Sequence, residues 1–268
     1  MTTASLICLG LLSGAGAGLL AGLVGIGGGI VVVPVVYYGL VSSGVSADQA
    51  AHVAVSTSLA AILPAAIVSS LGHWRAGNTD FAFLRDWGPG IAVGVVVAQF
   101  TAPHVRGSVL IGVFAAFCLL VAMRFAAPGR FRPILTQPLS GNWRWFSGVV
   151  IGLVSGFAGV GGGIMTNIVM SLSGLSMHKS IGRAAAAGVV VGAPATIMAA
   201  LAPNLGDAAQ LGSINLPIWA CIAPAQAAAA WIGAHLAQRT SANALSRVFA
   251  VSLAATGILM LRSSLAWH

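Results

Sequence analysis

The sequence predicts an all-α polytopic membrane protein made of two inverted-topology repeats, each with about four to five helical segments. Three observations predict this class: the composition is strongly apolar, the apolar residues form long segments, and one glycine motif occurs twice. Of the 268 residues, 58% are hydrophobic and 6% are charged, whereas soluble domains carry about a quarter charged residues. A chain of this composition lacks the polar residues that a water-exposed surface needs.

The formal net charge of +8 does not indicate a nucleic-acid partner, because the twelve basic residues are scattered between apolar runs and form no basic face. Their expected role is to orient loops in a lipid bilayer. The three cysteines, Cys8, Cys118 and Cys221, lie inside apolar runs without CxxC spacing and are expected to be small buried hydrophobes. The N-terminal sequence MTTASLICLG has no basic residue ahead of its apolar stretch, so no cleaved signal peptide is expected.

The apolar segments are long enough for membrane-spanning helices, which need about 20 residues. The first half contains 4–24, 28–42, 49–72, 88–103 and 107–126, and the second half contains 141–160, 163–174, 180–202, 215–236 and 244–265. The first two segments of each half are nearly continuous through a glycine cluster. A single helix over 4–42 would be about 60 Å long, too long for one crossing, so we expect the helix to break at the glycines near the membrane midplane.

The two halves are related in sequence. Residues 13–30, SGAGAGLLAGLVGIGGGI, align without gaps to 147–164, SGVVIGLVSGFAGVGGGI, with ten of eighteen positions identical. Pro64 then falls opposite Pro194 and Phe114 opposite Phe249. These matches predict a duplication, with a first transmembrane repeat at 1–126, a basic cytoplasmic linker at 127–140 and a second transmembrane repeat at 141–268.

Basic residues predict the orientation of the repeats. The segment 124–144 contains four arginines and is therefore placed in the cytoplasm. If each glycine-broken pair returns to the side where it began, ten of the twelve basic residues fall on the cytoplasmic side, with Arg106 and Arg262 outside. Both termini are then extracytoplasmic, and the second half is inverted relative to the first, as in many secondary transporters.

The glycine clusters GIGGGI at 25–30 and GVGGGI at 159–164 predict an anion site. A helix that restarts after a break offers free N–H groups and the positive end of its dipole, and glycine lets an anion approach closely. The residues expected to form the site are Gly27, Gly28, Gly29, Gly161, Gly162 and Gly163. The alternative is close helix packing, which is also the expected role of Gly14, Gly16, Gly18 and Gly22. A dinucleotide-binding fingerprint does not fit, because Ile30 occupies the position of its third glycine.

Polar residues within apolar segments are the other site candidates, because they are costly in lipid and often functional. His52, near the outer surface, and Arg183, near the inner surface, are candidate gating residues at the two mouths; Arg183 could instead reach the lipid headgroups. Further candidates for substrate contact are Ser56, Thr57, Thr166, Asn167, Gln99 and Gln226. The alternatives for these residues are hydrogen bonds between helices and, for Ser56 to Ser58, bonds to their own helix backbone.

The four acidic residues, Asp48, Asp80, Asp86 and Asp207, are expected in loops or at a membrane edge. No carboxylate is expected inside the bilayer, which disfavours acidic proton relays, sodium coupling and cation channels lined by acidic rings. An anion that moves outward gains about 2.3 kcal/mol per charge for each 100 mV of inside-negative potential, so anion export could run on the potential alone. No enzyme motif, metal site or cofactor site is expected.

The segments AGLVGIGGGIVVVP at 21–34 and SGFAGVGGGIMTNI at 155–168 resemble the sulfite exporter TauE/SafE family, also called the 4-toluene sulfonate uptake permease group. VAVSTSLAAILP at 53–64 supports this resemblance, which covers nearly the whole chain. It implies a multi-pass inner-membrane protein that moves sulfite or organosulfonate-like anions without ATP. The second half departs from the first at Asn167 and Ile168, and at RAAAA in 183–187, so we expect an asymmetric site.

The predicted function is therefore a secondary membrane transporter, an exporter, of a small sulfur-containing anion held between the two glycine breaks. The partners are the anionic substrate and the lipid bilayer, and a homo-oligomer is compatible with the sequence. The alternatives are a transporter or channel for another small anion or metabolite, and a membrane subunit that does not transport.

Overall fold

The computed structural model describes residues 3–25, 27–79, 81–126, 141–204 and 210–265. In the first half of this described part the elements are α1 (Thr3–Val24), α2 (Gly29–Ser42), α3 (Ala47–Arg75), α4 (Phe81–Thr101), the 3-10 helix η1 (Ala102–His104) and α5 (Gly107–Ala126). In the second half they are α6 (Asn142–Ala158), α7 (Gly163–Leu172), α8 (Met177–Leu201), β1 (Gln210–Leu211), β2 (Ile214–Asn215), α9 (Leu216–Arg239) and α10 (Ala242–Leu265). The predicted linker 127–140, with Asp80 and Asp207, lies outside the described residues.

The described part of the chain is all-α apart from one short antiparallel hairpin, in which Gln210 pairs with Asn215 and Leu211 with Ile214. Most helices begin and end within about three residues of the apolar segments predicted from sequence. The exception is α4, which begins at Phe81 rather than at residue 88. The charged pair Arg85–Asp86 was expected in a loop ahead of the helix, but both residues lie within α4. Asp86 is therefore in the second turn of α4.

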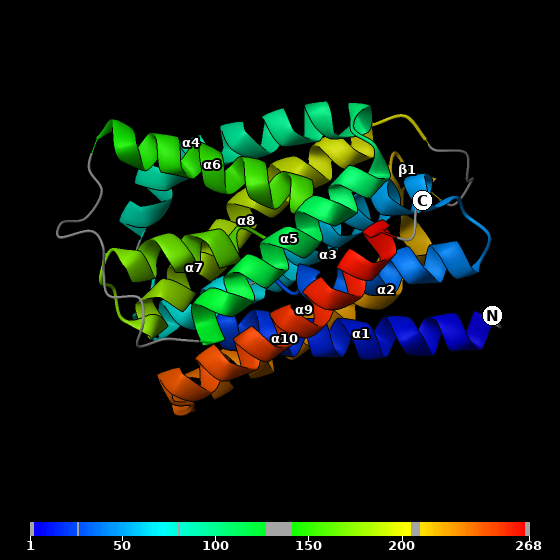
Figure 1. Cartoon of the computed structure of the whole chain (residues 1–268). Helices are drawn as coiled ribbons and strands as arrows, with labels where there is room; N and C mark the ends of the chain where they lie inside the picture. Colours follow the sequence, from blue (N-terminus) through cyan, green and yellow to red (C-terminus); the bar gives the residue numbers. More distant parts are fainter. Residues whose placement is uncertain (1–2, 26, 80, 127–140, 205–209, 266–268) are drawn as a thin grey trace.

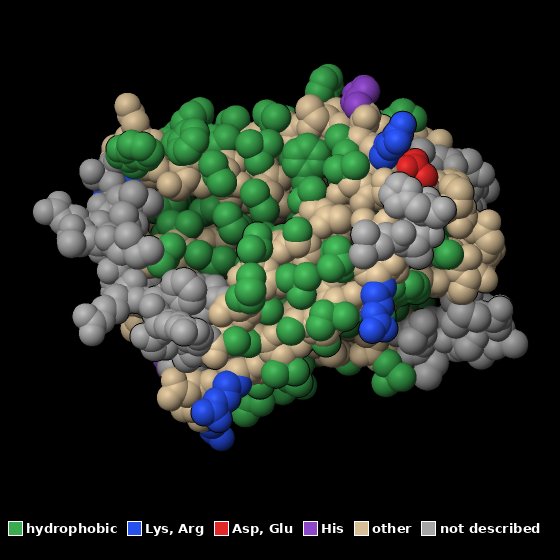
Figure 2. Space-filling view, in the orientation of Figure 1, with side chains coloured by type: hydrophobic (Ala, Val, Ile, Leu, Met, Phe, Trp, Pro, Cys, Tyr) green, Lys and Arg blue, Asp and Glu red, His purple; other side chains and the backbone are tan. Residues whose placement is uncertain are grey.

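Within the described residues, three helical stretches are long and apolar enough to cross a membrane: Ala47–Arg75, His178–Leu201 and Leu216–Arg239. Shorter apolar helices cover Gly10–Val24, Gly29–Ser42, Gly107–Met123 and Ala250–Ser264. Large apolar side chains are exposed on the outside of the bundle, among them Leu12 at 68%, Phe100 at 69% and Val251 at 69%. Figure 2 shows one face largely covered by hydrophobic side chains. Such a surface suits lipid rather than water, and the fold is that of a multi-pass membrane protein.

The helices pack in corresponding pairs from the two halves. α1 packs against α9 and α6 against α4, while α5 packs against α10 and α3 against α8. Both termini lie at one end of the elongated bundle, here called the terminal end, on the right in Figure 1. α5 ends and α6 begins at the opposite end, here called the linker end. α4 and α8 both run from the linker end to the terminal end.

Glycines allow the tightest of these helix contacts. A Cβ atom on Gly18 of α1 would lie 2.1 Å from the carbonyl oxygen of Gln226 in α9, and one on Gly152 of α6 would lie 2.1 Å from that of Ile91 in α4. The packing role predicted for Gly14, Gly18 and Gly22 fits this geometry. The same prediction is wrong for Gly16, where an added Cβ would meet no atom within 4 Å.

Candidate functional site

The two glycine segments lie against each other in the interior of the bundle. Helix α1 ends at Val24 and α2 begins at Gly29, while α6 ends at Ala158 and α7 begins at Gly163. A Cβ on Gly27 would lie 3.3 Å from the Cα of Gly161, and one on Gly29 would lie 2.6 Å from the carbonyl oxygen of Gly159. The fold thus brings together two motifs that are 134 residues apart in the sequence.

Backbone conformation explains the need for glycine at several of these positions. The φ angles of Gly25, Gly27 and Gly28 are 73°, 81° and 77°, and that of Gly159 is 66°. Residues with side chains rarely adopt this left-handed region. Gly28 forms the N-cap of α2 and Gly159 the C-cap of α6. Among the described residues, three glycines of the first segment and one of the second have positive φ angles, so the two segments differ in conformation.

Glutamine and serine side chains hold the glycine segments in place. Gln226 of α9 is fully buried and its Nε2 donates to the carbonyl oxygen of Gly27 at 2.6 Å. Ser58 of α3 donates its hydroxyl to the carbonyl oxygen of Gly159 at 2.9 Å. Both segments are therefore fixed by side chains from elements distant in sequence.

We expect Gly28→Ala to lower the free energy of unfolding by roughly 3 kcal/mol, from left-handed strain and overpacking together. The new Cβ would lie 2.6 Å from the carbonyl oxygen of Ala17 and 2.7 Å from Nε2 of Gln226. Gly44→Ala is the matched control, because Gly44 has a φ of 89° but open space around its Cβ position. Denaturation in detergent measures both variants; equal losses would mean that packing at Gly28 contributes nothing.

A cavity of about 350 Å³ opens near the linker end and is here called the basic cavity. It is lined by the starts of α4, α6 and α8 and by the last part of α7 with the turn that follows. Its lining residues are Ala82, Phe83, Asp86, Trp87, Arg144, Met170, Ser173, Leu175, Lys179 and Arg183. Three of these side chains are cationic and one is a carboxylate, so the lining residues that the structure describes carry a formal net charge of +2. This is the chemistry of a site for an anion.

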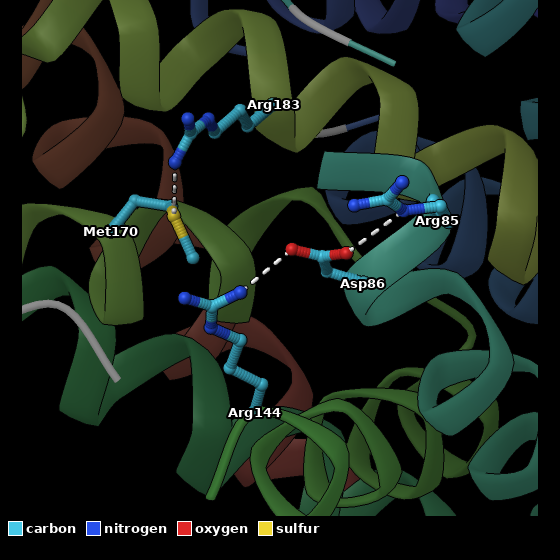
Figure 3. Close-up of polar contacts among 5 residues, drawn as sticks. All are labelled: Arg85, Asp86, Arg144, Met170 and Arg183. Carbon is cyan, nitrogen blue, oxygen red and sulfur yellow. Dashed lines mark hydrogen bonds and ion pairs between the residues drawn. The ribbon is translucent and has the colours of Figure 1, made fainter. Parts of the chain in front are cut away.

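Three charged lining residues, Asp86, Arg144 and Arg183, have defined partners (Figure 3). Nη1 of Arg144 lies 2.7 Å from Oδ2 of Asp86, whose Oδ1 lies 3.3 Å from Nε of Arg85. Nη1 of Arg183 lies 3.6 Å from the sulfur of Met170, and its Cζ lies 5.7 Å from the centroid of the Phe83 ring. Arg183 therefore presents its guanidinium within the cavity against soft, apolar neighbours.

A second cavity, of about 150 Å³, lies at the other end of α4 and α8 and is here called the His52 cavity. It brings together three residues singled out in the sequence, His52, Ser56 and Gln99. Gln99 also donates to the carbonyl oxygen of Gly156 at 3.1 Å. Ser213, in the turn of the β hairpin, lines the same cavity and donates to the hydroxyl of Ser56 at 2.8 Å.

The remaining predicted residues lie outside both cavity linings. Thr57 is fully buried and accepts a hydrogen bond at 3.0 Å from the backbone N–H of Asn215. Thr166 and Asn167 of α7 are also fully buried, and within the described part of the chain neither the Thr166 hydroxyl nor the Asn167 amide has a hydrogen-bond partner. Buried polar groups are nearly always hydrogen-bonded, so this pair has unused capacity for a partner such as water or a ligand.

A continuous cluster of buried apolar side chains separates the two cavities. It includes Phe83 and Trp87 of the basic cavity and Val55 of the His52 cavity. The residues between them are fully buried: Ile62, Ile91, Val95, Ile151 and Val191, here called the apolar partition. Both glycine segments border it, because a Cβ on Gly27 would lie 2.8 Å from Ile62 and one on Gly162 would lie 2.7 Å from Val191.

The family model for the sulfite exporter TauE/SafE matches residues 10–260, nearly the whole chain. The chain belongs to the TauE/SafE sulfite exporter family. It is 28% identical to a "Probable membrane transporter protein" of Haemophilus influenzae, over 97% of this chain and 99% of the relative. It is 26% identical to a Bacillus subtilis protein with the same description, over 64% of this chain and 68% of the relative.

A third relative, from Methanocaldococcus jannaschii, is also described as a "Probable membrane transporter protein" and is 24% identical over 91% of each chain. No solved structure gives a significant match. The family and these relatives indicate a membrane transporter, and the resemblance stated from the two glycine motifs is confirmed.

For this TauE/SafE family member, the sequence pattern identified Arg183 but not its companions in the basic cavity, Arg144, Lys179 and Asp86. Arg144 was counted only among the four arginines of segment 124–144, and Asp86 was expected in a loop or at a membrane edge. The available signal was that all three cations begin helices at the end predicted to be cytoplasmic. Their convergence depends on how α4, α6 and α8 pack, which a linear pattern does not contain.

Proposed function

We propose that this TauE/SafE family member is a secondary transporter that exports a small sulfur-containing anion, such as sulfite or an organosulfonate. The observation that carries the proposal is the basic cavity, where Arg144, Lys179 and Arg183 line one opening beside a single carboxylate. The His52 cavity lies at the other end of the same two helices. Two cavities separated by a closed partition suit a carrier that opens to one side at a time.

The proposal includes two inverted repeats. Support comes from the matched packing of α1 on α9 and α6 on α4, together with α5 on α10 and α3 on α8. In Figure 1, α1 begins and α2 ends toward the terminal end, whereas α6 begins and α7 ends toward the linker end. Opposite directions for the two glycine-containing pairs are what inverted duplication requires.

The proposed orientation places the linker end in the cytoplasm and both termini outside, in a bacterial-type inner membrane. Arg144, Lys179 and Arg183 begin helices at the linker end, in agreement with the rule that basic residues accumulate on the cytoplasmic side. Outward movement of an anion from the basic cavity is then favoured by about 2.3 kcal/mol per charge for each 100 mV. No coupling ion is needed for export in this scheme.

The glycine segments are proposed to separate enough for the anion to pass between them. Backbone atoms meet directly between them, since Gly27 faces the Cα of Gly161 and Gly29 faces the carbonyl oxygen of Gly159, and both segments border the apolar partition. In the closed arrangement, neighbouring atoms occupy the space that a Cβ atom on these glycines would need, so the glycines allow close helix packing. In an opened arrangement their N–H groups, the Asn167 amide and the Thr166 hydroxyl would contact the anion.

Purified protein in proteoliposomes tests this function. Vesicles are loaded in turn with radiolabelled sulfite, sulfoacetate and thiosulfate, with choline as a cation control. We expect flux of at least one of the three anions and none of choline. An unrelated carboxylate is loaded in a further set of vesicles. Flux of this carboxylate without flux of the three sulfur anions would redirect the assignment to another anion. Absence of all flux from folded protein would overturn it in favour of a membrane subunit that does not transport.

A further inference from the structure

The basic cavity contains its own anion. Among the described lining residues Asp86 is the one carboxylate, and its side chain is 27% exposed. It lies between two guanidinium groups, with Oδ2 2.7 Å from Arg144 and Oδ1 3.3 Å from Arg85 (Figure 3). Of the two arginines, Arg144 lines the cavity and is 36% exposed, whereas Arg85 is 82% exposed and is not among the lining residues.

A carboxylate and a sulfur oxyanion present the same kind of group to arginine. Each offers two or more charged oxygens to the planar fork of N–H donors, which binds such groups in pairs. An oxyanion that enters the basic cavity therefore competes with Asp86 for Arg144. The other cationic lining side chains, Arg183 and Lys179, lie across the same cavity and can hold the entering anion during the exchange.

We propose that Asp86 is a built-in counter-anion of the transport site: the substrate oxyanion binds Arg144 in place of the Asp86 carboxylate, and Asp86 returns to Arg144 as the substrate leaves. This inference rests on the proposed function, because it assigns the basic cavity as the cytoplasmic substrate site.

The exchange leaves no charge without a partner. When the substrate occupies Arg144, Asp86 keeps its contact with Arg85 on the same helix. When the cavity is empty, Arg144 is neutralised by Asp86. The carboxylate also limits how tightly the site holds an anion, which a carrier requires because binding must be weak enough for release.

The test is a sulfite titration by calorimetry, with flux in proteoliposomes, on the full-length protein. Asp86→Asn is expected to lower the Kd for sulfite about tenfold, which corresponds to about 1.4 kcal/mol, and to slow the maximal rate of export because release becomes slower. Asp86→Ser is a second variant if the asparagine variant is unstable. Asp48→Asn is the control at the terminal end; it keeps an oxygen to accept the bond from the N–H of Gly107 and should leave the Kd unchanged within about twofold.

A double-mutant cycle separates displacement from a general charge effect. If Asp86 acts through Arg144, then Asp86→Asn should change the Kd far less in an Arg144→Gln background. An unchanged Kd for sulfite in both Asp86 variants would overturn the counter-anion role. The same tenfold gain in sulfite affinity from Asp86→Asn in the Arg144→Gln background would also overturn it. Lack of sulfite binding and flux by the unmodified protein would instead overturn the proposed function, so the two failures are distinguishable.

Discussion

Arg183→Gln is expected to reduce anion flux roughly 10- to 100-fold, because a hydrogen bond to a charged group is worth about 1.5–3 kcal/mol. Arg183 lines the basic cavity and its guanidinium rests against the Met170 sulfur and the Phe83 ring. Without the Arg183 charge, the remaining cationic lining residues are Lys179 and Arg144, and Arg144 is already paired with Asp86. Arg183→Lys should be intermediate, since an ammonium lacks the planar fork of donors.

Initial rates of labelled sulfite flux in proteoliposomes measure this effect. Arg239→Gln is the matched control, because Arg239 is an exposed cation in the last turn of α9 and is not among the basic-cavity lining residues. Its flux should stay within about twofold of the unmodified protein. Thermal unfolding in detergent verifies that Arg183→Gln is folded. If folded Arg183→Gln transported at the normal rate, Arg183 would be a headgroup anchor and not part of the site.

Gly18→Val is expected to prevent assembly of the helical bundle. Even the Cβ atom of a new side chain would lie 2.1 Å from the carbonyl oxygen of Gln226 and 2.8 Å from its Cα. These are backbone atoms of α9, so no side-chain rotation relieves the overlap and α1 must move away from α9. Overpacking alone lowers the free energy of unfolding by about 1–3 kcal/mol. Displacing a whole helix interface should lower it further and remove much of a typical stability of about 5–15 kcal/mol.

Gly16→Val, two residues away on the same helix, is the control. Its Cβ position meets no atom within 4 Å, so the variant should purify as the unmodified protein does. Size-exclusion chromatography of both variants in mild detergent, with thermal unfolding of the recovered material, gives the comparison. A Gly18→Val protein that was monodisperse and as stable as Gly16→Val would contradict the close contact between α1 and α9.

Much of the helical fold follows from local sequence. Apolar segment length predicted most helix bounds closely, because burial in lipid requires continuous apolar residues. Helices α1 and α6 end at Val24 and Ala158, beside the two glycine runs. The start of α4 was missed because Arg85 and Asp86 are charged and interrupt the apolar run. At a helix end, however, charged side chains can extend toward the headgroups, and Asp86 is further held by Arg144 of α6.

The candidate site was less predictable, since it depends on contacts between distant elements. Gln226 was identified as a polar residue within a helix, but its bond to the Gly27 carbonyl joins α9 to the first glycine segment. Ser56 was identified in the same way, but its partner Ser213 belongs to a hairpin that no apolar pattern marks. The convergence of Arg144, Lys179 and Arg183 needs the starts of α6 and α8 to meet at one end of the bundle.

Sulfite efflux from proteoliposomes under an imposed membrane potential tests whether the protein exports a sulfur oxyanion. Vesicles of defined orientation are loaded with labelled sulfite, and a potassium gradient with valinomycin sets the potential. With the basic cavity facing the vesicle interior, we predict that efflux accelerates as the interior becomes more negative. We also predict that Arg183→Gln strongly reduces this efflux. Efflux no faster than from protein-free vesicles at every potential, with the protein folded, would contradict the proposed export.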